Sequence, residues 1–190
     1  MLCTGIVFDC DGVIFDSNHL KVLAFQKTLE EYPSKLVELF IDYHKSNAGI
    51  SRYVKLRYFI TDILDKPFAR VEYERLLTNF GAACVDLYDT ADLTPSCLQV
   101  LANLSAVVPL YIASGSDEAE LEQVFEKRGL ARYFRQIFGS PKNKFQCIEA
   151  AIGDLAAREN IIMIGDAMAD LRSAEQAGIK FVFMSAFSEN

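Results

Sequence analysis

The chain has 190 residues, a formal net charge of −7 and 51% hydrophobic residues. This length suits one compact domain with a modest insertion, and the composition excludes a disordered or fibrous protein. The acidic balance argues against nucleic acid as a partner, because surfaces that bind nucleic acid are basic. Five scattered cysteines, none in a C-x-x-C pair, predict free thiols in a reducing compartment rather than a structural zinc site.

The apolar segments are too short for membrane insertion or secretion. The start, MLCTGIVF, has no basic region before a long apolar run, so we expect no signal peptide. The longest apolar stretch elsewhere, residues 106–113, is far below the roughly 20 residues of a membrane span. We therefore expect a cytoplasmic protein with no membrane partner, and the sequence leaves its oligomeric state open.

Short apolar runs without alternation predict strands that are buried on both faces of a parallel sheet. These runs are residues 5–8, 107–113, 161–164 and 181–184, and a weaker strand is predicted at 136–138. Three of the runs end in polar clusters, DCDG, SGSDE and GDAMAD. Ligands of open parallel sheets bind outside the carboxyl ends of the strands, so we expect the chemistry at these clusters.

Helical patterns lie between the later strands. Asp117 is a candidate N-cap with Glu120 at the capping-box spacing, and Gly129 is expected to stop this helix. Further helices are predicted near residues 95–104, 143–157 and 168–177. This alternation predicts an α/β fold with a Rossmann-like, doubly wound parallel sheet.

Residues 17–87 interrupt the alternation. Their apolar residues recur at helical spacing and form no convincing strand. Breaks between about four helices are expected at Pro33, Gly49, Pro67 and Gly81. We therefore predict an α/β core domain of residues 1–16 and 88–190, with a small all-helical cap domain of residues 17–87.

Pairs of acidic residues follow two of the predicted strands. Asp9 and Asp11 leave the first strand two positions apart and can point into one crevice. Carboxylates this close usually have a cation near them, most often Mg2+ with its oxygen ligands. Asp166 and Asp170, four apart at a helix start, lie on one helix face.

Hydroxyl and basic groups follow two other strands. Ser114 ends the second strand, and its hydroxyl with nearby backbone N–H groups suits a phosphate oxygen. The loop GSPKNK offers Lys142 or Lys144 as a cation. We favour Lys144, because a lysine that opens the following helix reaches the crevice.

Each pattern alone has an ordinary structural explanation, such as a capping aspartate, a turn serine or an Asx turn. Their ordered occurrence at strand ends favours a functional site. The motifs resemble those of the haloacid dehalogenase superfamily, specifically its phosphatase-like members. DCDGV is similar to D-x-D-x-[TV], LYIASGS to an apolar strand ending in Ser or Thr, and GDAMAD to GDxxxD. The insertion resembles the helical cap that many members carry after the first motif.

This resemblance implies roles for the acidic residues. Asp9 would be the nucleophile that forms an aspartyl-phosphate, and Asp11 the general acid and then the base for water. Mg2+ would be the cofactor, held by Asp9, the backbone carbonyl of Asp11, and Asp166.

The resemblance also implies how the phosphoryl group is held. Ser114, the neighbouring Gly115 and the motif lysine Lys144 would bind its oxygens. Asp170 would position that lysine from outside the ligand shell.

Substrate selection is expected from the cap. Asn18 and Lys21 lie where the chain enters it, and Lys21 is the preferred contact for the phosphate or a second anionic group. Arg52 and Lys55 share a helix face and could bind a carboxylate or sugar acid, although a solvated face is the favoured interpretation. His44 is expected at the surface.

We therefore expect a Mg2+-dependent phosphatase whose partner is a small phosphorylated metabolite, for which a sugar phosphate is a plausible candidate. A sugar phosphomutase would use the same aspartyl-phosphate and stays open as an alternative. A binding module without catalysis, which takes a phosphorylated ligand, is the alternative from another class. A dehalogenase is disfavoured because dehalogenases of the superfamily lack the second aspartate, here Asp11.

Overall fold

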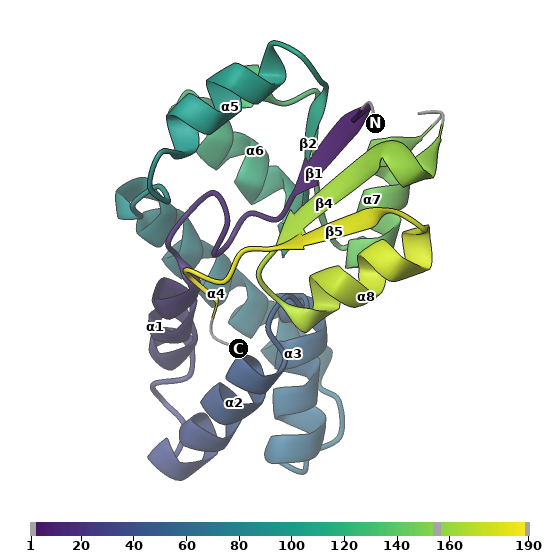
Figure 1. Cartoon of the computed structure of the whole chain (residues 1–190). Coiled ribbons are helices and arrows are strands. Elements are labelled where there is room, and N and C mark those ends of the chain that lie inside the picture. Colours follow the sequence, from purple (N-terminus) through teal and green to yellow (C-terminus); the bar gives the residue numbers. More distant parts are fainter. Residues whose placement is uncertain (1–2, 154–156, 189–190) are drawn as a thin grey trace.

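The computed structural model describes residues 3–153 and 157–188. Within these residues, five parallel strands form one sheet in the order β3-β2-β1-β4-β5 (Figure 1). The strands are β1 (Gly5–Phe8), β2 (Leu110–Asp117), β3 (Gln136–Ser140), β4 (Ile161–Gly165) and β5 (Lys180–Phe183). The chain moves outward from β1 first on one side and then on the other, so the predicted doubly wound α/β fold is confirmed.

The second strand lies further along the chain than predicted. The backbone N–H groups of Val107 and Val108 both donate to the carbonyl of Leu104, so these residues close the preceding helix instead of entering the sheet. At its other end, β2 continues past a bulge until Asp117 pairs with Ser140 of β3. The polar cluster that follows the apolar run therefore belongs to the strand itself.

Helices cover both faces of the sheet (Figure 1). One face packs against α5 (Cys97–Ser105) and α6 (Glu118–Lys127), and the other against α7 (Lys144–Ile152) and α8 (Met168–Ala177). The carboxylate of Asp117 caps α6 by accepting from the N–H groups of Ala119 and Glu120, as predicted. The helix expected over 143–157 ends at Ile152, and its residues 154–156 lie outside the described part of the chain.

The insertion is helical throughout its regular elements. It contains α1 (Asn18–Thr28), α2 (Ser34–Ser46), α3 (Arg52–Tyr58) with a π-helical turn at Phe59–Ile63, and α4 (Arg70–Thr90). The predicted division at residues 87/88 falls inside α4, which continues to Thr90. Within the described ranges, neither α4 nor any other helix is long and apolar enough to cross a membrane.

The break expected at Gly81 is wrong, because α4 runs through this position without interruption. Here the glycine serves close packing instead of ending the helix. A Cβ at Gly81 would lie 2.6 Å from Oε1 of Glu120 and 3.4 Å from Nη1 of Arg52. An ion pair between the insertion and α6 therefore crosses directly over this turn of α4.

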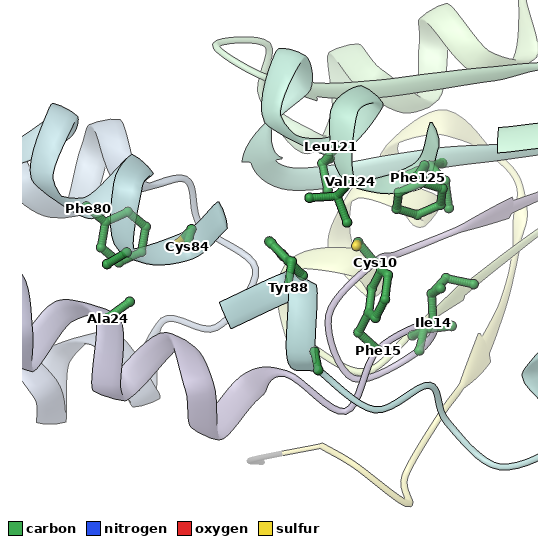
Figure 2. Packing of buried hydrophobic residues seen from close by; sticks show 14 of the residues in the cluster. Cys10, Ile14, Phe15, Ala24, Phe80, Cys84, Tyr88, Leu121, Val124 and Phe125 are labelled. Atoms are coloured by element: carbon green, nitrogen blue, oxygen red, sulfur yellow. The ribbon is translucent and has the colours of Figure 1, made fainter. Parts of the chain in front are cut away.

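The main apolar cluster joins the loop after β1 to α4 and α6. The ring of Phe15 lies 5.4 Å from that of Tyr88 and 5.8 Å from that of Phe125. Cys10, fully buried, points into the same cluster, where it faces α6 (Figure 2). Because Cys10 is buried between Asp9 and Asp11, it anchors the loop that carries both acids.

Candidate active site

Asp9 lies directly after β1, where the neighbouring strand β4 also ends. Its backbone N–H donates to the carbonyl of Ile164, which continues the pairing of β1 with β4 by one residue. Its carboxylate is buried and accepts from the N–H of Cys10 at 2.7 Å. The two strands therefore bring Asp9 beside the GDAMAD loop that follows β4.

Lys144 is the lysine that reaches the acids. Its ammonium lies 2.6 Å from Asp9 Oδ1 and 2.8 Å from Asp170 Oδ1, and donates to the carbonyl of Ala113 at 3.1 Å. Lys144 opens α7 directly after a capping box, as expected for a lysine held at a helix start. Lys142, the alternative, instead forms an ion pair of 2.7 Å with Glu118.

The GDAMAD loop is organised around Asp170. Its Oδ2 accepts from the backbone N–H groups of Asp166 and Ala167, at 3.2 and 3.1 Å. A Cβ at Gly165 would lie 2.5 Å from the Cβ of Asp170, so only glycine fits at the end of β4. This tight turn directs Asp166 toward the loop after β1.

Gly12, on the DCDG loop that faces Asp166, is also a position where a side chain would clash. Its φ of +74° lies in the left-handed region that favours glycine, and a Cβ there would stand 2.3 Å from Asp166 Oδ2. Asp166 also accepts a hydrogen bond of 2.7 Å from Nδ2 of Asn18. The two acidic motifs therefore come together only because Gly12 leaves room between them.

The acidic group suits a divalent cation. Within the described residues, carboxylate atoms of Asp9, Asp166 and Asp170 all lie within 4.8 Å of one another. Burial raises the pKa of Asp9 well above its usual range, with Asp170 adding to the rise and Lys144 opposing it. Burial also raises the pKa of Asp166 to about 7. Buried carboxylates that resist ionisation in this way would be stabilised as anions by a cation, and their hard oxygen atoms fit Mg2+.

Asp11 has different surroundings from Asp9, and its carboxylate is not part of that acidic group. Hydroxyl and ammonium groups donate to it from Ser17, Tyr88, Lys21 and Ser116, at 2.6, 2.7, 2.8 and 3.1 Å. Burial alone would raise the pKa of Asp11, but the charge of Lys21 and these hydrogen bonds lower it to about 2. Asp11 is therefore an anion at neutral pH in this arrangement.

The loop at the end of β2 supplies small groups next to Asp11. Ser114 is fully buried, and its Oγ accepts from the N–H of Ser116 at 3.1 Å. Gly115 and Ser116 line the pocket that contains Asp9 and Asp11. A Cβ at Gly115 would lie 2.7 Å from the carbonyl of Gly49, so the cap loop touches the core at this glycine.

Residues at the entrance to the cap face the core acids. Asn18 donates to Asp166, as described above, and Lys21 contacts both Asp11 and the hydroxyl of Ser116. Both side chains line the pocket. The interpretation of Asn18 and Lys21 as site residues thus has a geometric basis in contacts with Asp11 and Asp166.

The expected solvated face of α3 is wrong. Arg52 and Lys55 are buried, with side chains directed at the pocket. Arg52 forms two hydrogen bonds with Glu120, of 2.8 and 2.7 Å, and stacks over the ring of Phe80 at 4.7 Å. The surface position expected for His44 is also wrong, since His44 is 7% exposed and lies 2.7 Å from Lys55. Helical spacing showed which residues share a face, but not that the face packs on the core.

Several residues of this site were not singled out by any sequence motif. Tyr88 and Ser17 contact Asp11. In the sequence, neither residue differs from an ordinary helix or turn residue. Ser116 could have been found, because it belongs to the polar cluster SGSDE that follows the apolar run of this strand. His44 reaches the pocket through its contacts with Lys55 and Phe25 inside the insertion, and Glu120 contacts the cap through Arg52.

Comparison with known proteins identifies the family. A model of the haloacid dehalogenase-like hydrolases matches residues 3–178. The chain belongs to this family. The resemblance drawn from DCDGV, LYIASGS and GDAMAD is therefore confirmed, as is the expectation of a hydrolase. A separate comparison with curated proteins gave no match.

Solved structures show the same fold at low identity to this haloacid dehalogenase-like hydrolase. A hydrolase from Pseudomonas syringae aligns with a TM-score of 0.77 and 19% identity over 95% of this chain and 84% of that one. A predicted phosphoglycolate phosphatase from Haemophilus somnus gives 0.76 and 18% over 96% and 84%. The HAD-hydrolase YfnB from Bacillus subtilis, bound to magnesium, gives 0.70 and 16% over 96% and 89%.

Proposed function

We propose that this haloacid dehalogenase-like hydrolase is a Mg2+-dependent phosphatase of small phosphorylated metabolites, with sugar phosphates as candidate substrates. The observation that carries the proposal is the contact of Lys144 with both Asp9 and Asp170, at 2.6 and 2.8 Å. This lysine holds a buried carboxylate at a strand end, in a pocket that also contains a second acid, Asp11. Such a set provides a nucleophile, a cation for phosphoryl oxygens and a group for proton transfer.

The nucleophile in this proposal is Asp9. Its carboxylate oxygen would attack phosphorus and form an aspartyl-phosphate, while the bond to the leaving oxygen breaks. Burial lowers the pKa of Lys144, but Asp170 and Asp9 outweigh it and hold the pKa above its usual value, so the ammonium stays charged. Lys144, with the backbone of Gly115 and the hydroxyl of Ser114, would bind the phosphoryl oxygens.

Asp11 would transfer the protons. In the second step it takes a proton from water as the water attacks the aspartyl-phosphate, and its low pKa means that it is ionised for this task. In the first step it must hold a proton for the leaving oxygen. We infer that Lys21 moves from Asp11 to the phosphate when substrate binds, which lets the carboxyl take up that proton.

Mg2+ would be bound by Asp9, Asp166 and the backbone carbonyl of Asp11. When bound, it would offset the repulsion between the anionic carboxylates and an anionic phosphate. Asp170 would keep Lys144 in place, since its other oxygen is fixed by backbone N–H groups of the GDAMAD loop. The family assignment, the neighbour named for phosphoglycolate and the magnesium-bound neighbour support this chemistry.

The test is release of phosphate from a panel of phosphorylated sugars, sugar acids, nucleotides and glycolate, with Mg2+ or with EDTA. We expect turnover that requires Mg2+ and is reduced at least 1,000-fold, as expected for loss of a nucleophile, in Asp9→Asn. The control is Asp16→Asn, a partly exposed acid seven residues further along the chain, which should keep wild-type turnover. Substantial activity in Asp9→Asn would remove that residue from the nucleophile role. Absence of turnover with an aspartyl-phosphate still trapped would favour a phosphomutase.

A further inference from the structure

Asn18 is a residue of the cap whose side chain contacts an acid of the core. It is the first residue of α1, and its Nδ2 lies 2.7 Å from Oδ2 of Asp166. The same nitrogen lies 2.9 Å from the backbone carbonyl oxygen of Phe187, in the segment that follows β5. Asn18 also lines the pocket that contains Asp9 and Asp11. The proposed phosphoryl transfer leaves this residue without a role.

The two contacts determine which way the amide of Asn18 faces. Its partners are a carboxylate oxygen and a backbone carbonyl oxygen, which both accept hydrogen bonds. The NH2 group of an asparagine has two hydrogens to donate, whereas its oxygen can only accept. In the reverse orientation, Oδ1 would face two acceptors and repel both. Asn18 therefore uses one hydrogen on Asp166 and the other on the segment after β5.

The segment after β5 also holds the backbone around Asp166. The N–H of Met184 donates to the carbonyl of Gly165 at 2.8 Å. Oγ of Ser188 donates to the carbonyl of Asp166 itself at 2.6 Å. These bonds fix the main chain, whereas the bond from Asn18 acts on the carboxylate, which rotation about the side-chain bonds could turn away.

Space for the bond between Asn18 and Asp166 comes from Gly12. A Cβ at Gly12 would lie 2.3 Å from Oδ2 of Asp166 and 2.7 Å from Nδ2 of Asn18. Donor and acceptor therefore both pack against the DCDG loop. Three segments meet at this bond, namely the loop after β1, the loop after β4 and the start of the cap.

A neutral amide is a suitable partner for a carboxylate that binds a cation. A carboxylate has about four lone-pair sites, so a bond from Asn18 leaves others for a metal ion. The amide carries no charge and does not repel a divalent cation as an ammonium would. Groups that bind metal ions are commonly oriented by such hydrogen bonds from residues outside the ligand set. Loss of one of these bonds costs roughly 10- to 100-fold in metal affinity.

We propose that Asn18 is a positioning residue for Mg2+, which directs the carboxylate of Asp166 toward the ion and does not contact the substrate. The proposal rests on the Mg2+ dependence in the proposed function and adds a residue to it. Because Asn18 opens the first helix of the insertion, the affinity for Mg2+ then depends on a residue outside the α/β core.

The test is calorimetric titration of MgCl2 into the protein without substrate. In Asn18→Ala we expect the Kd for Mg2+ to rise about tenfold. Asn18→Leu fills the space but donates nothing, so the same rise in this variant shows that a cavity is not the cause. The control is Asn47→Ala, which removes an amide hydrogen bond of 2.9 Å to the backbone of Tyr43 within the insertion. This control should keep the wild-type Kd.

Steady-state kinetics separate positioning from substrate contact. When MgCl2 saturates each protein, the KM of Asn18→Ala for a phosphate ester should stay within about threefold of the wild-type value, and excess MgCl2 should restore turnover. A raised KM with an unchanged Kd for Mg2+ would instead make Asn18 a substrate contact and overturn the proposal. A merely structural role would lower the unfolding free energy measured without Mg2+ and leave the Kd unchanged.

The outcomes also separate this proposal from the phosphatase function. A wild-type Kd in Asn18→Ala would overturn the positioning role and leave the phosphatase function intact. Weaker Mg2+ binding in both Asn18 variants, with no phosphate released from any ester by wild type, would uphold the positioning role and reject the phosphatase function. A wild-type protein that hydrolyses esters but binds no Mg2+ would overturn the positioning role together with the Mg2+ dependence.

Discussion

Asp9 and Asp11 are separated by one residue, yet their surroundings drive their pKa values in opposite directions. Burial and the charge of Asp170 raise the pKa of Asp9, whereas Lys21 and nearby hydroxyl groups lower that of Asp11 despite its burial. The difference arises because Cys10 is buried between them and directs the two carboxylates to different partners. Two acids with separated pKa values can take different roles in one reaction.

Tyr88 should act as a positioning residue for Asp11. Its hydroxyl donates to Asp11 Oδ1 at 2.7 Å, and burial raises the pKa of the phenol well above its usual value, so it remains a neutral donor. Tyr88→Phe removes this hydrogen bond together with the 3.1 Å hydrogen bond between the same hydroxyl and that of Ser116. We expect kcat to fall about tenfold, equivalent to about 1.4 kcal/mol, with KM changed less than threefold.

The matched control for this change is Tyr73→Phe. It removes the partly buried hydroxyl that donates to the backbone carbonyl of Tyr53 at 3.0 Å within the insertion, away from Asp11. Both variants should lose about 1 kcal/mol of unfolding free energy, the usual contribution of one such bond. Equal kcat values in the two variants would show that Tyr88 has only a structural role.

His44 should make the protein less stable as the pH falls below neutral. Its pKa is lowered from 6.5 to about 2 by burial and by Lys55, so the folded state keeps this ring neutral. The unfolded state takes up a proton as the pH falls through 6.5, and the folded state does not. Stability from this group is therefore complete above that pH and is lost progressively below it. Between pH 7.5 and 5.5 the loss is about 1.4 kcal/mol.

Urea denaturation of wild type and His44→Asn at these two pH values isolates the contribution. The asparagine can accept from Lys55 but does not titrate, so the variant should lose about 1.4 kcal/mol less than wild type between pH 7.5 and 5.5. His19→Asn, at the exposed second histidine, should behave as wild type. An identical pH dependence in wild type and His44→Asn would mean that the ring is protonated in the folded state.

At the scale of elements, the contact between α4 and α6 depends on Gly81. This glycine gives Glu120 room to meet Arg52 across the turn of α4. Alanine is favoured over glycine inside a helix by about 1 kcal/mol, but here its methyl group would meet the carboxylate at 2.6 Å. A glycine, although a poor helix former, at this position therefore leaves room for a partly buried ion pair between Arg52 and Glu120.

We therefore expect the effect of Gly81→Ala on the unfolding free energy to change sign when Glu120 is also replaced, which a double-mutant cycle measures. In wild type, Gly81→Ala should lower the unfolding free energy by about 1 kcal/mol, because it displaces Glu120 from Arg52. In Glu120→Ala the obstacle is gone, and the same change should raise it by up to about 1 kcal/mol. Urea denaturation of the four proteins measures both effects. The same sign in both backgrounds would mean that the ion pair does not depend on Gly81.

Sequence patterns predicted the local structure well where the deciding contacts are between residues close together in the sequence. The Asp117 cap follows from sequence because its partners, the N–H groups of Ala119 and Glu120, lie within three residues. Gly81 was misplaced because the side chains that it makes room for, those of Arg52 and Glu120, lie far from it along the chain. Val107 was misplaced for a local reason, because its β-branched side chain favours a strand while its N–H closes the preceding helix on Leu104. Propensity and spacing cannot reveal a long-range contact that overrides them.

At the scale of the whole molecule, the core side and the cap side of the site differ in how far the sequence could predict them. Part of the core side could be predicted, since parallel strands that end at one edge bring Asp9 and Asp166 together. The cap side could not, because the burial of Lys55 and His44 depends on how the insertion folds over the core. Nothing in the helical spacing of α2 and α3 determines that packing.

Mg2+ should stabilise the whole fold, because its expected ligands come from segments that only folding brings together. Asp9 follows β1 and Asp166 follows β4, so the unfolded chain has no comparable site. A ligand that binds only the folded state adds about 2.7 kcal/mol at one hundred times its Kd. We therefore expect the unfolding free energy of wild type to rise with MgCl2 concentration.

The variant Asp166→Ala decides whether this stabilisation comes from the acidic group. It removes a buried carboxylate of the group, and Mg2+ should then add less than about 0.5 kcal/mol at the concentration that is saturating for wild type. Asp42→Ala, at an exposed acid of α2, should retain the full effect. NaCl at equal ionic strength separates specific binding from screening, which would act alike on all three proteins. Equal stabilisation of Asp166→Ala and wild type by MgCl2 would place the metal elsewhere, since a cation held between two strand ends cannot keep its affinity when one end loses its carboxylate.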